Sequence, residues 1–147
     1  GDKSAPCGCG LFGCAEALLS GANFEKRAAK KYAKFRGLKS REIAAIAREK
    51  KHRHSQEARK LFEAYSHHLA IAIQNYIVLY APEVVLLAGS FASAHDCFLP
   101  KTKSLLPQLL KRRRKSIDML PKIAVSKLDN LSGLLGAAFV AREKFLS

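Results

Sequence analysis

The most informative stretch of the sequence is residues 7–14, which read Cys7-Gly8-Cys9-Gly10-Leu11-Phe12-Gly13-Cys14. Three thiols this close along the chain are poorly placed to form disulfides with one another and well placed to bind one ion. Zinc prefers four ligands in a tetrahedron, and three thiolates provide most of that shell. Glycine adopts positive φ at little cost, which suits a chain that wraps around an ion. We therefore predict a metal site at Cys7, Cys9 and Cys14. The alternative is a redox or disulfide-bonded loop, which is less favoured because the fourth cysteine, Cys97, is distant.

The composition is that of one domain with room for a hydrophobic core. The sequence has 147 residues, of which 48% are hydrophobic. No apolar run approaches the length of a membrane span and no secretory signal is visible, so we expect a cytoplasmic protein without a membrane partner. Position 1 is glycine and the single methionine is Met119. We therefore expect translation to begin upstream of Gly1.

The charge balance is strongly basic, with 26 Lys and Arg against 12 Asp and Glu, a net charge of +14. The basic residues gather in residues 26–41, 48–54 and 111–115. Such a surplus can bind phosphates by releasing counterions. The basic runs lack interleaved aromatic residues and match no nucleic-acid-binding module. We therefore favour a solvated basic surface, and keep a small zinc-containing nucleic-acid-binding protein as an alternative.

Hydrophobic periodicity predicts an alternation of helices and short strands. We expect a helix directly after Cys14, a second helix capped by Asn23 and ending near Gly37, and a third capped by Ser40. Apolar residues at steps of three and four predict a long amphipathic helix over residues 56–80, which Pro82 ends. We expect a loop between the third and the long helix, at residues 50–55.

The remaining residues predict a parallel α/β layer. Residues 84–87 form an aliphatic run typical of a strand buried on both faces, and residues 88–90 form the turn after it. A helix is expected over residues 98–114, with Pro107 as a break or the true start, followed by a second strand at 123–125. A last helix follows from Ser132 to about Phe145. Two strands are too few for a complete sheet, so we expect further strands upstream.

The cysteine cluster also resembles a family signature. The pattern C-x-C-G-x-x-G-C-x-E, followed by Ser20-Gly21, is similar to the zinc motif of the ROK family of sugar kinases, sugar-responsive repressors and related proteins. Two later segments resemble the same family in order and spacing. Residues 84–90 (Val-Val-Leu-Leu-Ala-Gly-Ser) resemble its adenosine-side strand and turn, and residues 132–138 (Ser-Gly-Leu-Leu-Gly-Ala-Ala) resemble its C-terminal helix.

The resemblance implies an α/β fold: the C-terminal part of a ribonuclease-H-like, actin-like ATPase domain, helix-rich, with a loop-bound zinc. On this interpretation residues 1–16 form the zinc loop, 17–80 a helical part, and 83–147 a strand-helix-strand-helix part. The zinc would be structural and would brace the wall of the sugar pocket. The family's fourth ligand is a histidine upstream of the first cysteine, which residues 1–6 lack. The substitutes left open are water, a neighbouring molecule, or one of His52, His54, His67, His68 and His95.

The resemblance also implies roles for individual residues. Glu16 would hydrogen-bond sugar hydroxyls, where the alternative is a glutamate that only favours the start of a helix. Gly89 and Ser90 would lie on the nucleotide side, although the family usually has two adjacent glycines where this chain has Ala88-Gly89. The glycines of the last helix would pack closely on the sheet. The family's catalytic aspartate and phosphate loops precede the zinc motif, so no catalytic residue is expected in this chain.

The sequence therefore favours the C-terminal segment of a hexose kinase that uses ATP and magnesium. The partners expected are a hexose or amino sugar, ATP and the upstream part of the same protein; a homodimer is left open. The first alternative is the sugar-binding effector domain of a ROK repressor, where an upstream helix-turn-helix would read DNA. The catalytic aspartate and phosphate loops would distinguish the two, because a repressor does not need them.

Overall fold

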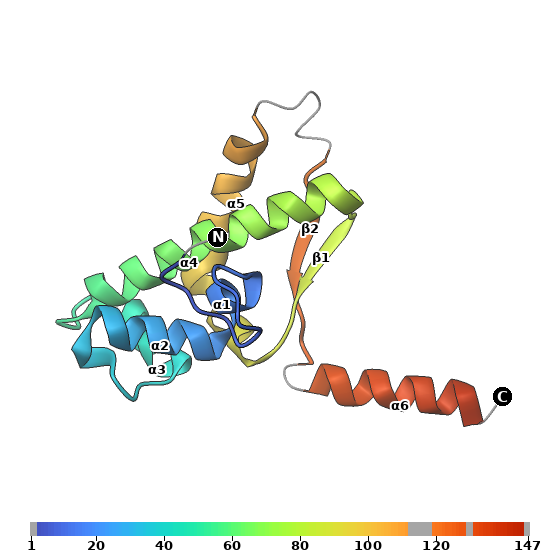
Figure 1. The fold of residues 1–147 in the computed structure, drawn as a ribbon, viewed down its shortest axis with the longest axis horizontal. Coiled ribbons are helices and arrows are strands. Elements are labelled where there is room, and N and C mark those ends of the chain that lie inside the picture. Colours follow the sequence, from blue (N-terminus) through green and yellow to red (C-terminus); the bar gives the residue numbers. More distant parts are fainter. Residues whose placement is uncertain (1–2, 112–118, 129–130, 146–147) are drawn as a thin grey trace.

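The computed structural model describes residues 3–111, 119–128 and 131–145. Figure 1 shows a helical body, a two-stranded ribbon beside it and a separate terminal helix. In chain order the elements are α1 (Ala15–Leu19), α2 (Gly21–Lys31), the 3₁₀ helix η1 (Ala33–Phe35), α3 (Ser40–Arg48), α4 (Ser55–Tyr80), β1 (Val84–Leu87), the 3₁₀ helix η2 (Ser90–Ala94), α5 (His95–Leu110), β2 (Lys122–Val125) and α6 (Ser132–Phe145). No helix among these residues is both long and apolar enough to cross a membrane.

An aromatic cluster forms the centre of the helical body. The rings of Phe24 and Phe62 lie 4.8 Å apart, and Phe91 stacks on Phe98 at 5.6 Å with an interplanar angle of 16°. Tyr65 contacts three members of this cluster. Aromatic side chains bury large apolar areas and gain further from offset and edge contacts. The cluster therefore joins α2, α4, η2 and α5 into one core.

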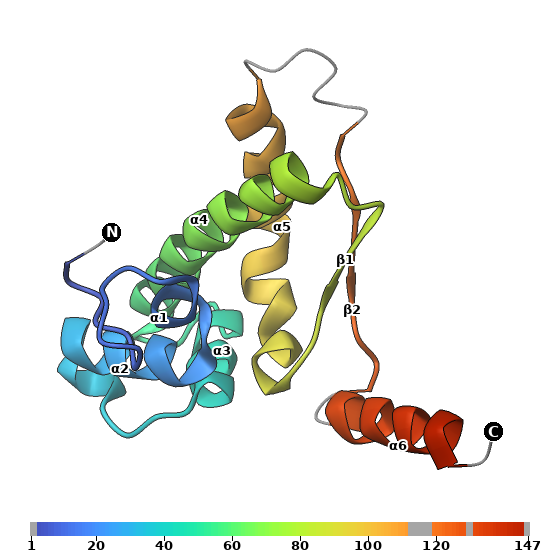
Figure 2. The ribbon, with the colours of Figure 1, turned by 45° about the vertical axis from the view of Figure 1, so that its right-hand side comes forward.

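The two longest helices, α4 and α5, cross closely because small polar residues lie at the crossing (Figure 2). Ser66 is fully buried. Its hydroxyl donates to the carbonyl of Phe62 at 2.8 Å and lies 3.0 Å from the carbonyl of Phe98. The buried hydroxyl of Thr102 bonds the carbonyl of Phe98 at 3.0 Å. Each buried hydroxyl thus has a partner, as burial of polar groups requires.

The strands β1 and β2 form a parallel pair, with Val84 opposite Lys122 and Leu87 opposite Val125. The predicted parallel layer is therefore confirmed. The prediction that the first strand is buried on both faces was wrong, because Val84 and Leu86 are 53% and 60% exposed. Only the alternate residues, Val85 and Leu87, pack on the helical core.

The last helix, α6, begins at Ser132 as predicted, but it does not pack on the sheet. In both views it lies apart from the helical body (Figures 1 and 2). Leu134, Phe139 and Val140 are each more than 60% exposed, and a Cβ added at Gly133 or Gly136 would meet no atom within 4 Å. The close helix–sheet packing predicted for these glycines is thus absent from the described residues.

The N-terminal caps of α2 and α3 lie three residues and one residue before the predicted positions. Ser20, not Asn23, caps α2: its hydroxyl accepts from the backbone N–H of Asn23 at 3.3 Å. Ser40 is the first residue of α3, and Lys39 precedes it as the cap, its N–H bonded to the Glu42 carboxylate at 2.7 Å. Ser20, Asn23 and Ser40 are all of the residue types that favour the cap, so residue type alone did not show which position each would occupy.

The helix predicted over residues 98–114 begins earlier, at His95, and continues through Pro107 without a break. Pro100 and Pro107 both lie on its exposed side. The carbonyls that lose a backbone partner there can be solvated, so the helix continues despite both prolines. The predicted end at Arg114 lies outside the described residues, as does most of the basic run 111–115.

Candidate functional site

The cysteine loop is a tight turn held by its own backbone. Pro6 and Phe12 form an antiparallel bridge, and the N–H of Cys7 donates to the carbonyl of Leu11 at 2.8 Å. Gly10 and Gly13 have φ of 84° and 70°, which side chains rarely adopt. The predicted use of positive φ in this loop is therefore confirmed at two of its three glycines.

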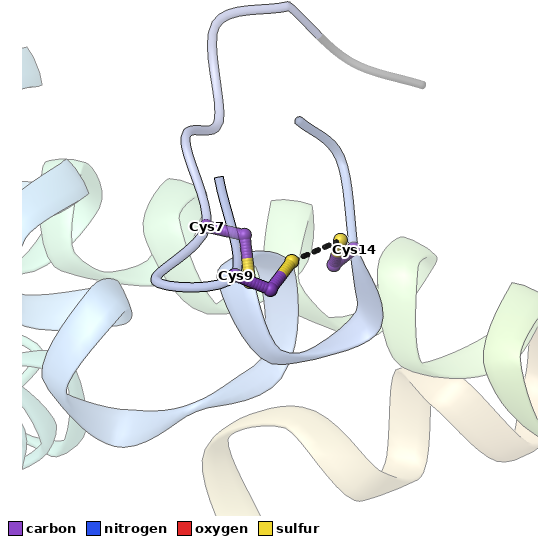
Figure 3. A group of neighbouring side chains, drawn as sticks. All are labelled: Cys7, Cys9 and Cys14. Atoms are coloured by element: carbon purple, nitrogen blue, oxygen red, sulfur yellow. Dashed lines mark hydrogen bonds between the residues drawn. The ribbon is translucent and has the colours of Figure 1, made fainter. Parts of the chain in front are cut away.

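The three predicted metal ligands converge. The sulfur atoms of Cys7, Cys9 and Cys14 all lie within 4.8 Å of one another, and those of Cys9 and Cys14 are 3.6 Å apart (Figure 3). This distance is too long for a disulfide, and all three cysteines are free. Tetrahedral zinc with Zn–S bonds of about 2.3 Å places its sulfurs about 3.8 Å apart. The three thiols are therefore close enough together to be ligands of one metal ion, and the Cys9–Cys14 spacing is near that of a zinc tetrahedron.

Hydrogen bonds within the cluster shift the pKa values of Cys9 and Cys14 in opposite directions. A hydrogen bond from the backbone of Leu11, and then those from the neighbouring thiols, lowers the pKa of Cys9. The pKa of Cys14 rises to about 11, because hydrogen bonds with the thiols of Cys9 and Cys7 favour its protonated form. The cluster thus resists accumulating thiolates on its own. A divalent cation would remove that penalty by neutralising the charges.

No histidine joins the three cysteines in the described part of the chain. Among the described residues, which include all five histidines, no histidine, aspartate or glutamate joins the three cysteines as a group within 4.8 Å. His95 bonds the carbonyl of Ala92 at 3.0 Å, and His54 contacts Lys34 at 3.1 Å. Glu16 does contact the cluster, with Oε2 at 3.8 Å from the sulfur of Cys7.

The short helix α1 carries Glu16 and depends on contacts from elsewhere in the fold. A helix of five residues is not stable alone, and its carbonyl end needs partners. Arg27 of α2 donates to the carbonyls of Ala17 and Leu18, and the hydroxyl of Tyr65 in α4 donates to that of Leu19 at 3.2 Å. These bonds fix α1, and with it the exposed Glu16 beside the cysteines.

A cleft of about 430 Å³ joins the two regions that the sequence analysis singled out. One wall is the Ser20-Gly21 turn that ends α1, and the other is the Ala88–Ala92 turn that follows β1. Gly89 has φ of 90°, and Ser90 opens η2. Gly21 lies so close to Phe91 that a Cβ would meet its ring at 3.3 Å. Gly89 and Ser90 are thus brought near the end of α1.

Sequence reasoning missed Gly21 and Arg27 as contributors to this site. Ser20-Gly21 was interpreted only as a break between helices and as part of a motif. Its place in the cleft follows from the packing of α2 on Phe91, which is 70 residues away along the chain. Arg27 gave no signal, because it is one of many basic residues in the run 26–41. Its role depends on the last carbonyls of α1 pointing toward Arg27, which the sequence does not show.

Comparison with known proteins places the chain in a family. Residues 1–144 match the ROK family. The N-acetyl-D-glucosamine kinase of Escherichia coli O6:H1 is 28% identical over 91% of this chain and 41% of its own length. That of Vibrio cholerae serotype O1 is 30% identical over 91% of this chain and 41% of its own length. The chain therefore spans about two fifths of the curated relatives that it matches.

Solved structures show the same fold. A ROK family glucokinase from Streptomyces griseus, in complex with glucose and AMPPNP, superposes with a TM-score of 0.76 at 20% identity, covering 94% of this chain and 47% of that one. A ROK family transcriptional regulator, a homologue of the Escherichia coli MLC protein, superposes with a TM-score of 0.59 at 19% identity, covering 82% of this chain and 31% of that one. Because the family match extends over nearly the whole sequence, the chain belongs to the ROK family.

Proposed function

We propose that this chain is the part of a ROK sugar kinase that holds a structural zinc, contacts the sugar and lines the nucleotide side of the cleft. The observation that carries the proposal is the cleft itself, in which the turn ending the Glu16 helix faces the Gly89-Ser90 turn. The kinase names of the curated relatives support the same conclusion. The reaction would transfer the γ-phosphoryl group of ATP, with magnesium, to a hydroxyl of a hexose or amino sugar.

In this proposal Cys7, Cys9 and Cys14 hold zinc, and the zinc has a structural role. Three thiolates with a fourth ligand form a closed shell, which leaves no open position for chemistry. The ion would fix the start of α1, and Glu16 would then present its carboxylate to sugar hydroxyls at a defined place. A carboxylate accepting hydroxyl hydrogen bonds orients a sugar without being the base of the reaction.

The base and the phosphate loops are proposed to come from an upstream part of the same protein. The exposed apolar surfaces support this partner, because Val84 and Leu86 on the outer face of β1 and the leucines of α6 are not covered by described residues. Contiguous exposed apolar surface commonly marks a contact with another part of a protein. We propose that the upstream part extends the sheet and covers these side chains.

The test is the sugar-kinase activity of this chain joined to that upstream part, with glucose and N-acetylglucosamine as substrates. Glu16→Gln should lower kcat/KM by about 10- to 100-fold, since hydrogen bonds to a charged group contribute about 1.5–3 kcal/mol. Glu49→Gln is the matched control, because Glu49 is also exposed and lies after α3, away from the cysteine loop and α1. Equal effects of the two substitutions would contradict the proposed role of Glu16.

The same assay separates the kinase from the repressor alternative. Binding of sugar without phosphoryl transfer would instead favour a sugar-sensing effector domain. Binding of neither sugar nor ATP would overturn the proposal.

A further inference from the structure

A second cavity, of about 320 Å³, lies between α3, α4 and the start of α5. Three of its seven lining residues are cationic and one is acidic; the lining consists of Ala47, Arg48, Lys50, Arg59, Phe62, Asp96 and Cys97. None of these residues lines the cleft of the proposed kinase site. Three cations and one carboxylate from separate elements therefore face one cavity that the proposed function does not use.

The single carboxylate in this cavity is neutralised by Arg48. The guanidinium donates from Nε and Nη2 to the two carboxylate oxygens of Asp96, at 2.8 and 2.6 Å, and also to the carbonyl of Ser93 at 3.1 Å. This paired geometry is the strong form of an arginine–carboxylate contact, and Arg48 accordingly holds the pKa of Asp96 below its usual value. The remaining cations, Arg59 and Lys50, therefore determine the local charge.

Arg59 is fixed in place with most of its donors unused. Its Nε donates to the carbonyl of Ala47 at 2.8 Å, which satisfies one of the last carbonyls of α3. Within the described part of the chain this is its one hydrogen bond, so both terminal nitrogens remain for a ligand. The Lys50 ammonium makes no hydrogen bond or ion pair with any described residue.

We propose that this cavity binds a phosphate dianion, either free phosphate or the phosphate of a small monoester. A guanidinium presents its donors in a planar fork that matches phosphate oxygens, and a lysine adds a point charge. The first turn of α5, which carries Asp96 and Cys97 into the cavity, adds the positive end of a 16-residue helix. Phe62, which is fully buried, also lines the cavity. The volume accommodates a phosphate with a small organic group.

The test is a titration of the 147-residue chain with inorganic phosphate at 150 mM NaCl, followed by amide NMR and calorimetry. We expect saturable binding with a dissociation constant of about 1 mM or below, in line with a few charge-assisted contacts. The shifted amides should be those of residues 48–50 and 95–98. Lys50→Gln should weaken binding about 3- to 10-fold and Arg59→Met by more than 10-fold.

Lys51→Gln is the matched control, because Lys51 is an exposed neighbour with the same charge that does not line the cavity. It should change the dissociation constant less than twofold. Lys50→Gln keeps the test valid even if Arg59→Met destabilises α3, since Lys50 has no partner among the described residues to lose. Absence of saturable binding, or equal weakening by Lys50→Gln and Lys51→Gln, would overturn the proposal. Tighter binding of glycerol 3-phosphate than of phosphate would identify a monoester as the ligand, and the reverse order would identify free phosphate.

Discussion

Substitution of Arg27 by methionine should loosen α1 while the rest of the fold stays intact. The guanidinium donates from its two terminal nitrogens to the carbonyls of Ala17 and Leu18, the second at 2.6 Å. Two charge-assisted bonds from one partly exposed side chain contribute about 2 kcal/mol in total. Every 1.4 kcal/mol is a factor of ten, so the opening equilibrium of α1 should shift about 30-fold toward the open form.

Hydrogen exchange measured by NMR reports this opening directly. The N–H groups of Leu18 and Ser20 donate to the carbonyls of Cys14 and Glu16, at 3.1 and 3.0 Å, and become exposed only when α1 opens. Arg27→Met should lower their protection about 30-fold, while amides in the middle of α4 change only with global stability.

The matched control is Lys26→Met, which removes the same charge from the adjacent position of α2. Lys26 is exposed and has no hydrogen bond or ion pair with a described residue. Its substitution should leave the protection of Leu18 and Ser20 within twofold of the wild type. Protection of these amides unchanged by Arg27→Met, or lowered equally by Lys26→Met, would refute the assignment of Arg27 as the residue that holds α1.

Three further predictions concern stability. Arg48 lowers the pKa of Asp96, so the ion pair stabilises the fold above pH 3.8, and this stabilisation is lost as the pH falls. It amounts to less than about 1 kcal/mol, because both side chains are half-exposed. Asp96→Asn should remove this acid dependence of stability. Burial raises the pKa of Tyr65 to about 12, so the phenol ionises first in the unfolded chain and the free energy of unfolding should fall from pH 10 to pH 12. In denaturant titrations, Tyr65→Phe should abolish this contribution to the pH dependence. The substitution should also cost about 1 kcal/mol at neutral pH. Gly89→Ala should lower stability by about 1–2 kcal/mol, because the φ of Gly89 is 90°. Gly136→Ala should raise stability by up to about 1 kcal/mol, because Gly136 lies in a helix with open space around it. Thermal denaturation of both variants tests the two predictions.

Much of the local structure could be predicted from the sequence because it depends on periodicity. The apolar steps of three and four over residues 56–80 predicted the long helix α4 to within one residue at its start, and the aliphatic run 84–87 coincides with β1. The convergence of Cys7, Cys9 and Cys14 could be predicted because they lie within eight residues, so the geometry is local.

The predictions that failed concern the surroundings of a helix or strand, meaning which other elements or how much solvent it contacts. Burial of both faces of β1 was inferred from composition, but the described residues cover only the face that carries Val85 and Leu87. The small residues of α6 allow close packing without specifying a partner, and α6 is exposed. Pro107 was expected to mark a break or the true start of a helix, but α5 runs through it. The cost of an internal proline depends on whether the freed carbonyl reaches water, and the sequence alone does not show this.

The most direct test of the central claim is the zinc content of the purified chain, measured by native mass spectrometry with elemental analysis. The account predicts one zinc per chain in the wild type and in Cys97→Ser, whose thiol lies outside the cluster. It predicts no retained zinc in Cys14→Ser, with a loss of stability that addition of zinc does not restore. A wild-type chain without zinc, or a Cys14→Ser variant that retains it, would contradict the metal site and the role proposed for the residues around it.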